Sequence, residues 1–135
     1  MSSTTSTTTP PGEEGCTPGF WKQPQHLDSW VTYSPSQTLG SVFTLTGEFA
    51  GLADVTLLAA LDFEGGPTTA DAAEVLLRQA VAALLNAASP DVDYPLTEAE
   101  IIAAVNAALA TGDRATILDL AEELDTFNNL FCPLD

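Results

Sequence analysis

Residues 71–88 read DAAEVLLRQAVAALLNAA. Apolar residues recur in this stretch at intervals of three and four, the spacing that gathers side chains on one face of an α-helix. The pattern predicts an amphipathic helix over about residues 70–88, stopped by Ser89-Pro90, with Glu74 and Arg78 in the favourable i, i+4 order. The expected buried face comprises Ala73, Leu76, Leu77, Ala80, Val81, Leu84 and Ala88, and the opposite face mainly comprises Asp71, Glu74, Arg78, Gln79 and Asn86.

Two more helices are expected towards the C-terminus. Thr97 and Glu100 have the spacing of a capping box, which predicts a helix that begins at Thr97 and ends at Gly112. Asp113 is a suitable N-cap for a third helix over about residues 114–125. Because short loops join the three helices, antiparallel packing in a small bundle is expected. The predicted inward side chains are Ile101, Ile102, Val105, Ala108, Leu109, Ile117, Leu120, Ala121 and Leu124.

Residues 16–67 contain most of the aromatic side chains and many glycines and prolines, which do not permit long helices. Thr17 followed by Pro18 predicts the start of a short helix, and residues 37–43 and 56–63 are further candidates. Residues 41–49 alternate partly and could instead form a short strand. The expected fold class is therefore all-α, a compact irregular helical bundle with an aromatic-rich N-terminal half and three C-terminal helices.

The first fifteen residues are dominated by Ser, Thr and Pro and contain no side chain that could anchor a core. This composition predicts a linker or tail over residues 1–15, ahead of a helical domain over residues 16–135. Such tracts commonly serve as extended stalks outside the cell, and the alternative is a disordered terminus.

The charge balance excludes several classes of function. The 135 residues include 19 Asp and Glu against three Lys and Arg, for a formal net charge of −16. No cationic face for nucleic acid can be built from three basic side chains, and an anionic membrane surface would repel the chain. No apolar run reaches the roughly 18 residues that a membrane span requires. A soluble, acidic domain without direct membrane insertion is expected.

The two cysteines, Cys16 and Cys132, lie at the two ends of the expected domain. A disulfide between them would close a loop of more than a hundred residues and contribute roughly 4–5 kcal/mol in the chain-entropy model. Such a bond implies an oxidising compartment, and the alternative is two unrelated buried thiols. A zinc site is not expected, because the chain has two cysteines, one histidine and no Cys-x-x-Cys pair.

Four separated motifs are similar to those of a known domain. They are CTPGFWK at residues 16–22, LRQAVAALLNA at 77–87, AVNAALA at 104–110, and Leu124-Asp125 with Asn128-Asn129 before Cys132-Pro133-Leu134. Together they resemble an uncharacterised domain that recurs in exported bacterial cell-surface proteins. The resemblance implies secretion and an end-to-end disulfide, and it supplies no catalytic residue. That domain usually continues with Asn-His-Pro and soon a second Trp, whereas this chain reads Gln23-Pro24-Gln25-His26 before Trp30.

Aromatic and acidic side chains offer candidate chemistry of low specificity. A sugar-stacking platform or the core beneath the disulfide could be formed by Phe20, Trp21, Trp30 and Tyr33. His26 is the only histidine, and a structural role near Trp30 is expected for it. With 19 acids, some carboxylate pair will always suit a glycoside hydrolase, so the pairing alone does not indicate one.

Calcium is the one cofactor to consider. The candidate ligands are Asp119, Glu122, Glu123 and Asp125 near the end of a helix, with Asn128 and Asn129 beyond them, and a second group of Asp91, Asp93, Glu98 and Glu100. Neither group has EF-hand spacing, and a solvated acidic surface is the simpler interpretation.

The sequence therefore predicts a non-catalytic structural or adhesive module of an exported protein, outside the cell or at its surface. The expected partners are other domains of a larger surface protein or copies of itself. The alternatives are a carbohydrate-binding module that uses surface aromatics, a filament subunit, and a small acid-catalysed hydrolase.

Overall fold

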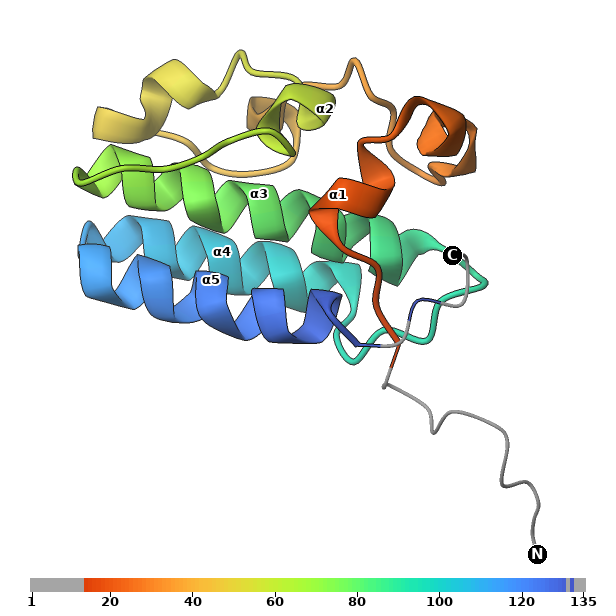
Figure 1. The fold of residues 1–135 in the computed structure, drawn as a ribbon. Helices are drawn as coiled ribbons and strands as arrows, with labels where there is room; N and C mark the ends of the chain where they lie inside the picture. Colours follow the sequence, from red (N-terminus) through yellow and green to blue (C-terminus); the bar gives the residue numbers. More distant parts are fainter. Residues whose placement is uncertain (1–13, 131, 133–135) are drawn as a thin grey trace, which may run out of the picture.

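The computed structural model describes residues 14–130 and Cys132, and over this part of the chain the fold is all-α with no strand. Figure 1 shows the long C-terminal helices beneath a series of short helical turns. The α-helices are α1 (Pro18–Trp21), α2 (Leu57–Ala60), α3 (Thr69–Ala88), α4 (Glu98–Thr111) and α5 (Arg114–Asn128), and the 3₁₀ helices are Pro24–Ser29, Leu39–Ser41 and Gly47–Leu52. The expected fold class and the three C-terminal helices are confirmed.

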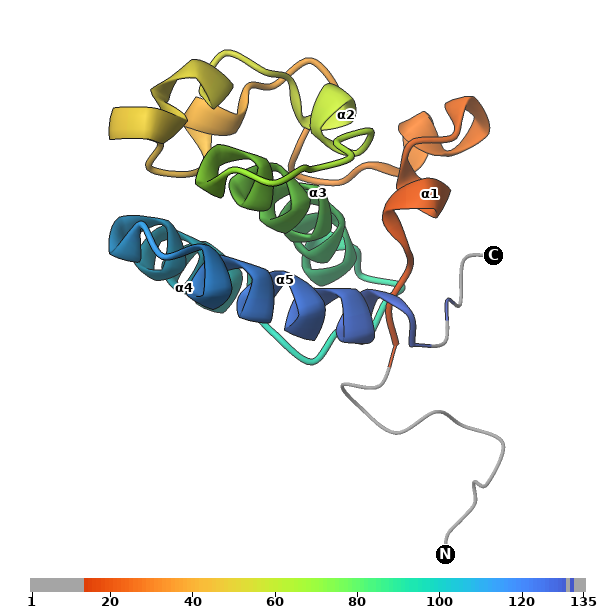
Figure 2. The ribbon, with the colours of Figure 1, turned by 60° about the vertical axis from the view of Figure 1, so that its left-hand side comes forward.

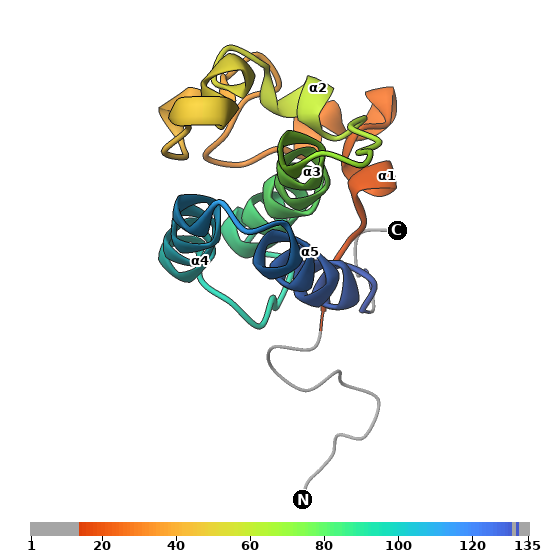
Figure 3. The same ribbon diagram turned by 90° about the vertical axis from the view of Figure 1, so that its left-hand side faces the viewer.

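Helix α3 lies at the centre of the molecule. In the end-on view of Figure 3, α4 and α5 lie on one side of it and the short N-terminal helices on the other. Residues 79–86 are consequently buried without interruption. The prediction that Gln79 and Asn86 belong to the polar outer face is wrong, because the N-terminal half covers that face and leaves the two residues 4% and 0% exposed.

The ends of the long helices follow from their capping residues. Thr97 and Glu100 form the predicted capping box, and Gly112 ends α4 in the left-handed conformation with φ 64°. Asp113 caps α5, and its hydrogen bonds from the side chain and backbone of Thr116 lower the pKa of its carboxyl. Helix α3 has a second capping box, Thr68 with Asp71.

Helix α5 continues one turn past its predicted end at Asp125 and reaches Asn128. The Asn129 side chain donates to the carbonyl oxygen of Asp125 at 2.7 Å, which satisfies one of the acceptors left free at a helix end.

The expected pairing of Glu74 with Arg78 is absent from the structure. Arg78 instead donates through Nη1 to the carbonyl oxygen of Phe63 at 2.9 Å. Among the described residues, an ion pair forms between Lys22 Nζ and Asp62 Oδ1, which lie 2.8 Å apart.

The N-terminal half consists of turns secured by specific backbone contacts. Thr17 accepts a hydrogen bond from Phe20 N and so caps α1, as predicted. Residues 41–49 form no strand, since a 3₁₀ turn occupies Leu39–Ser41 and Gly47 adopts φ 61°. An isolated antiparallel bridge joins Thr38 to Thr56.

Glu14 and Gly15 already belong to the folded part of the chain. Glu14 N donates to Asp93 O at 3.0 Å, and Asp93 N donates to Glu14 Oε1 at 2.8 Å. A side chain at Gly15 would collide with the carbonyl oxygen of Phe127, so only glycine allows this close approach to α5. The rest of the predicted tail, residues 1–13, lies outside the described residues.

Candidate functional site

A disulfide joins Cys16 to Cys132 across a sequence separation of 116, with their Cα atoms 4.7 Å apart. The bond predicted from the positions of the two cysteines is therefore confirmed. Cys16 is completely buried and Cys132 is half-buried. The entry and exit of the helical domain are thus held side by side by a covalent bond.

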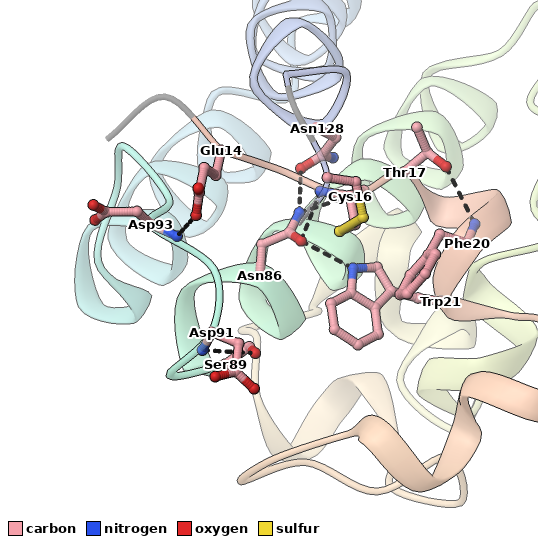
Figure 4. The surroundings of a disulfide bond; sticks show 11 residues. Glu14, Cys16, Thr17, Phe20, Trp21, Asn86, Ser89, Asp91, Asp93 and Asn128 are labelled. Atoms are coloured by element: carbon pink, nitrogen blue, oxygen red, sulfur yellow. Dashed lines mark hydrogen bonds between the residues drawn. A yellow bond between two sulfur atoms is a disulfide. The ribbon is translucent and has the colours of Figure 1, made fainter. Parts of the chain in front are cut away.

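Asn86 fixes the backbone of the first cysteine. From the end of α3 its Oδ1 accepts from Cys16 N and its Nδ2 donates to Cys16 O, both at 2.8 Å. The same Oδ1 accepts from the indole of Trp21 at 3.1 Å, as Figure 4 shows. The side-chain amide of Asn86 therefore hydrogen-bonds both backbone polar groups of Cys16, as the backbone of a neighbouring strand would.

Asn128 extends this network to the end of α5. Its Oδ1 accepts from Asn86 Nδ2 at 3.1 Å and from the Tyr94 hydroxyl at 2.7 Å. Its Nδ2 donates to the backbone oxygen and to Oε1 of Gln79, at 3.0 and 2.9 Å. We call Gln79, Asn86, Tyr94 and Asn128 the amide network. It connects α3 and α5, which lie side by side in Figure 2, with the loop before α4, and Figure 4 shows Asn86 and Asn128 beside Cys16.

The amide network is suited to fixing structure. Its amides carry no charge at any ordinary pH, and burial, together with the charge of Glu123, raises the pKa of the Tyr94 hydroxyl, which keeps it protonated. A buried polar group left without its partner costs roughly 1–3 kcal/mol, so each member holds the others in place.

The amide network was not predicted from the sequence, because Gln79 and Asn86 are polar and were therefore assigned to the solvent-facing side of their helix. The available signal was Asn86 within the otherwise apolar run ALLNAA, since an isolated amide in a buried helix needs partners of its own.

The structure places the four candidate aromatics in different environments. Trp21 is completely buried, and Phe20 packs edge-on against it with ring centroids 5.1 Å apart. Half-buried Trp30 donates to the Trp21 carbonyl oxygen at 3.1 Å. Tyr33 donates to Glu98 Oε1 at 2.7 Å, and burial and that carboxylate raise its pKa. With Trp21 enclosed, these side chains do not form one open stacking surface.

The imidazole of His26 stacks on Phe20, with ring centroids 3.9 Å apart. His26 belongs to the 3₁₀ helix Pro24–Ser29, which ends at Trp30. No hydrogen bond links that imidazole to a hydroxyl or carboxylate among the described residues.

The calcium candidates are not assembled into one site. Asn128 is buried and already bonded within the amide network, and Asn129 donates to Asp125. In the described part of the chain, no three His, Cys, Asp or Glu side chains come together as a metal would require, either here or around the second group. Asp119, Glu122, Glu123 and Asp125 are exposed on α5.

The fold and site define a small helical domain in which a disulfide joins the two ends of the chain next to a buried amide network. Comparisons with protein-family models, curated proteins and solved structures find no match. No helix in the described residues has the length and apolar character needed to cross a membrane.

Proposed function

We propose that this chain is a non-catalytic structural or adhesive module of an exported cell-surface protein, and that its disulfide transmits tension past the fold. The observation that supports the proposal is the 4.7 Å between the Cα atoms of Cys16 and Cys132 at the two ends of the domain.

A force applied to the chain before Cys16 and after Cys132 passes through the sulfur atoms. The helices between them lie outside the path of tension and need not resist it. Without the bond, unfolding of the 116-residue separation would lengthen the chain by roughly 390 Å. A protein stretched between a cell and a surface would keep this domain folded only while the bond is intact.

Export is supported by the bond itself, since disulfides persist mainly in oxidising compartments. The Ser/Thr/Pro tract before Glu14 is of the kind found in extracellular stalks. The likeness of the CTPGFWK start and the Asn-Asn, Cys-Pro-Leu end to a recurrent exported domain supports the same location.

A non-catalytic role is supported by the use of the polar side chains. The buried amides bond to one another and to the chain, and the only imidazole stacks on Phe20. The aromatic sugar platform has less support, because Trp21 lies in the core.

The mechanical part is tested by stretching the full chain between two marker domains in a single-molecule force measurement. We expect the oxidised protein to show only the marker unfolding steps, and the Cys16→Ser/Cys132→Ser variant to add one step of about 390 Å in contour length. An equally long step from the oxidised protein would overturn the proposal.

Export is tested separately in the cells that make the protein. An impermeant reagent that labels surface lysines of intact cells should modify Lys22, which is exposed. The two cysteines should resist alkylation until a reductant is added. Recovery of the chain only from the cytoplasm with free thiols would contradict the assignment.

A further inference from the structure

The two halves of the disulfide differ in their access to solvent. Cys16 is 0% exposed, whereas Cys132 is half-buried. Thiol–disulfide exchange requires the attacking thiolate to reach the sulfur atom with which it forms the new bond. An external thiol therefore cannot attack Cys16 while the domain is folded, and Cys132 is the half of the bond that it can reach.

Cys16 is held in the fold by contacts that do not involve its sulfur atom. Its backbone N and O are hydrogen-bonded by Asn86, both at 2.8 Å. Before it, Glu14 N donates to Asp93 O at 3.0 Å and Asp93 N donates to Glu14 Oε1 at 2.8 Å. After it, Thr17 caps α1. None of these contacts depends on the bond between the sulfur atoms, so we expect Cys16 to stay in place after that bond is broken.

The exchange needs no reactant other than the thiol. The incoming thiolate gives an electron pair to Cys132 Sγ and forms a mixed disulfide, while the bond to Cys16 Sγ breaks and its electron pair leaves on Cys16. Cys16 then takes a proton from water and becomes a thiol. The incoming sulfur is oxidised and Cys16 is reduced. Because Cys16 stays in place, it can attack the mixed disulfide in return, expel the external thiolate and restore the original bond.

The charges around the disulfide restrict the external thiol. Figure 4 shows Glu14, Asp91 and Asp93 in its surroundings, and none of the residues labelled there is basic. Asp91 and Asp93 are exposed, and Lys22, which follows α1, is paired with Asp62. Exposed charges act on an approaching group over a Debye length, about 8 Å at physiological ionic strength. They repel an anionic thiol and attract a cationic one.

We propose that Cys132 is a thiol-exchange site, at which a thiol on a positively charged carrier forms a mixed disulfide while the domain stays folded and keeps Cys16 as a buried free thiol. The exchange would join the chain covalently to its partner through Cys132. The inference goes beyond the proposed function, because the choice of sulfur is the same whether or not the domain carries tension.

The test uses the full chain with one cysteine at a time. Cys16→Ser leaves the thiol of Cys132, and Cys132→Ser leaves that of Cys16, so no intramolecular bond can reverse the reaction. Each variant is mixed with cystamine, a small disulfide with two amino groups, and the attachment is followed by mass spectrometry. We expect the Cys132 thiol to react about a hundredfold or more faster than the Cys16 thiol, because access controls cysteine reactivity. In concentrated urea the two rates should be about equal.

A second substitution tests what keeps Cys16 enclosed. Asn86→Ala, added to Cys132→Ser, removes the hydrogen bonds to the Cys16 backbone and should raise the rate at Cys16 about tenfold or more. Asn106→Ala is the matched control, because Asn106 bonds Thr44 N and makes no hydrogen bond to Cys16. It should leave the rate at Cys16 unchanged.

The charge preference is tested with oxidised glutathione, which is anionic, beside cystamine. In the Cys16→Ser chain, Asp93→Asn should raise the rate with glutathione relative to that with cystamine about twofold at low ionic strength, and added salt should remove the difference. Glu48→Gln is the matched control, because Glu48 is exposed on the 3₁₀ helix Gly47–Leu52, which lies far from α1 in Figure 1. It should leave the ratio of the two rates unchanged.

Several results would overturn the inference. Equal rates at Cys16 and Cys132 without urea would show that the fold does not choose between the sulfur atoms. Loss of the helical circular dichroism of Cys132→Ser would show that Cys16 is not held without the bond. Equal effects of Asp93→Asn and Glu48→Gln on the ratio of rates would contradict the preference for a cationic thiol.

Discussion

The side chain of Asn86 hydrogen-bonds both backbone polar atoms of Cys16, 70 residues earlier in the chain. The disulfide fixes the sulfur end of Cys16, and Asn86 fixes its backbone. Cys16 is therefore held in place in two ways, by the covalent disulfide and by hydrogen bonds that depend on the side chain of Asn86 alone.

Replacing Asn86 should destabilise the protein strongly. Asn86→Ala leaves Cys16 N, Cys16 O and the Trp21 indole without their buried partner, and we expect a loss of about 3–5 kcal/mol in the free energy of unfolding. Urea unfolding of the oxidised protein measures it. The control is Asn106→Ala, since Asn106 accepts one hydrogen bond, from Thr44 N, at a half-buried position, and it should cost about 1 kcal/mol. Equal losses from the two variants would contradict the role given to Asn86.

Asn86→Asp tests the donor half of the same side chain. The acceptor towards Cys16 N remains, but an oxygen then faces Cys16 O and Asn128 Oδ1. Because an ionised carboxylate there would be buried beside two acceptors, the variant should be less destabilised at acidic pH than at neutral pH relative to the parent protein. Urea unfolding at both pH values checks this difference, and a pH-independent loss would mean that Nδ2 contributes little.

The protonation of Tyr94 predicts a loss of stability in alkali. Burial raises the pKa of its hydroxyl in the folded state above the ordinary value of about 10. The unfolded state therefore releases its proton first, and the free energy of unfolding falls as the pH rises above about 10. Tyr94→Phe should make this fall shallower and should cost about 1 kcal/mol at neutral pH, where the bond to Asn128 is lost. Urea unfolding from pH 7 to 11 measures both effects, and an unchanged slope above pH 10 in the variant would contradict the prediction.

The parts of the fold that could be predicted from sequence are those fixed by local chemistry. Thr17, Thr97, Gly112 and Asp113 end or begin helices through contacts within a few residues, and the apolar spacing of α3 is read directly. The surroundings of Asn86 and Gln79 depend on segments that lie 42 to 70 residues away, and helical periodicity carries no information about them.

Helical periodicity likewise carries no information about which distant residues share a pocket. Arg78 was assigned to the outer face of its helix from the apolar spacing alone. The packing of α1 against α3 brings Lys22 and Arg78 to one pocket of about 240 Å³.

Thr32 has a backbone conformation that its side chain disfavours. Its φ is 73°, in the left-handed region, where a β-branched residue is uncommon. Thr32 is exposed, so replacing it removes no core contact. Thr32→Asn should raise the free energy of unfolding by about 0.5–1 kcal/mol, because asparagine tolerates this region. Thr32→Val keeps the branch and should give no gain in the same urea assay. A gain from both variants would assign the effect to something other than φ.

The acidic surface predicts how the protein responds to salts. A net charge of −16 carries self-repulsion that any cation relieves by screening, whereas a specific calcium site would add stabilisation of its own. The candidate ligands around α5 lack the required convergence, because Asn128 is bonded within the amide network and Asp119, Glu122 and Glu123 lie exposed on the helix. Calcium chloride and sodium chloride at matched ionic strength should therefore raise the melting temperature about equally, as differential scanning calorimetry can establish. A larger rise with calcium that disappears in Asp125→Asn would instead identify a calcium site at the end of α5.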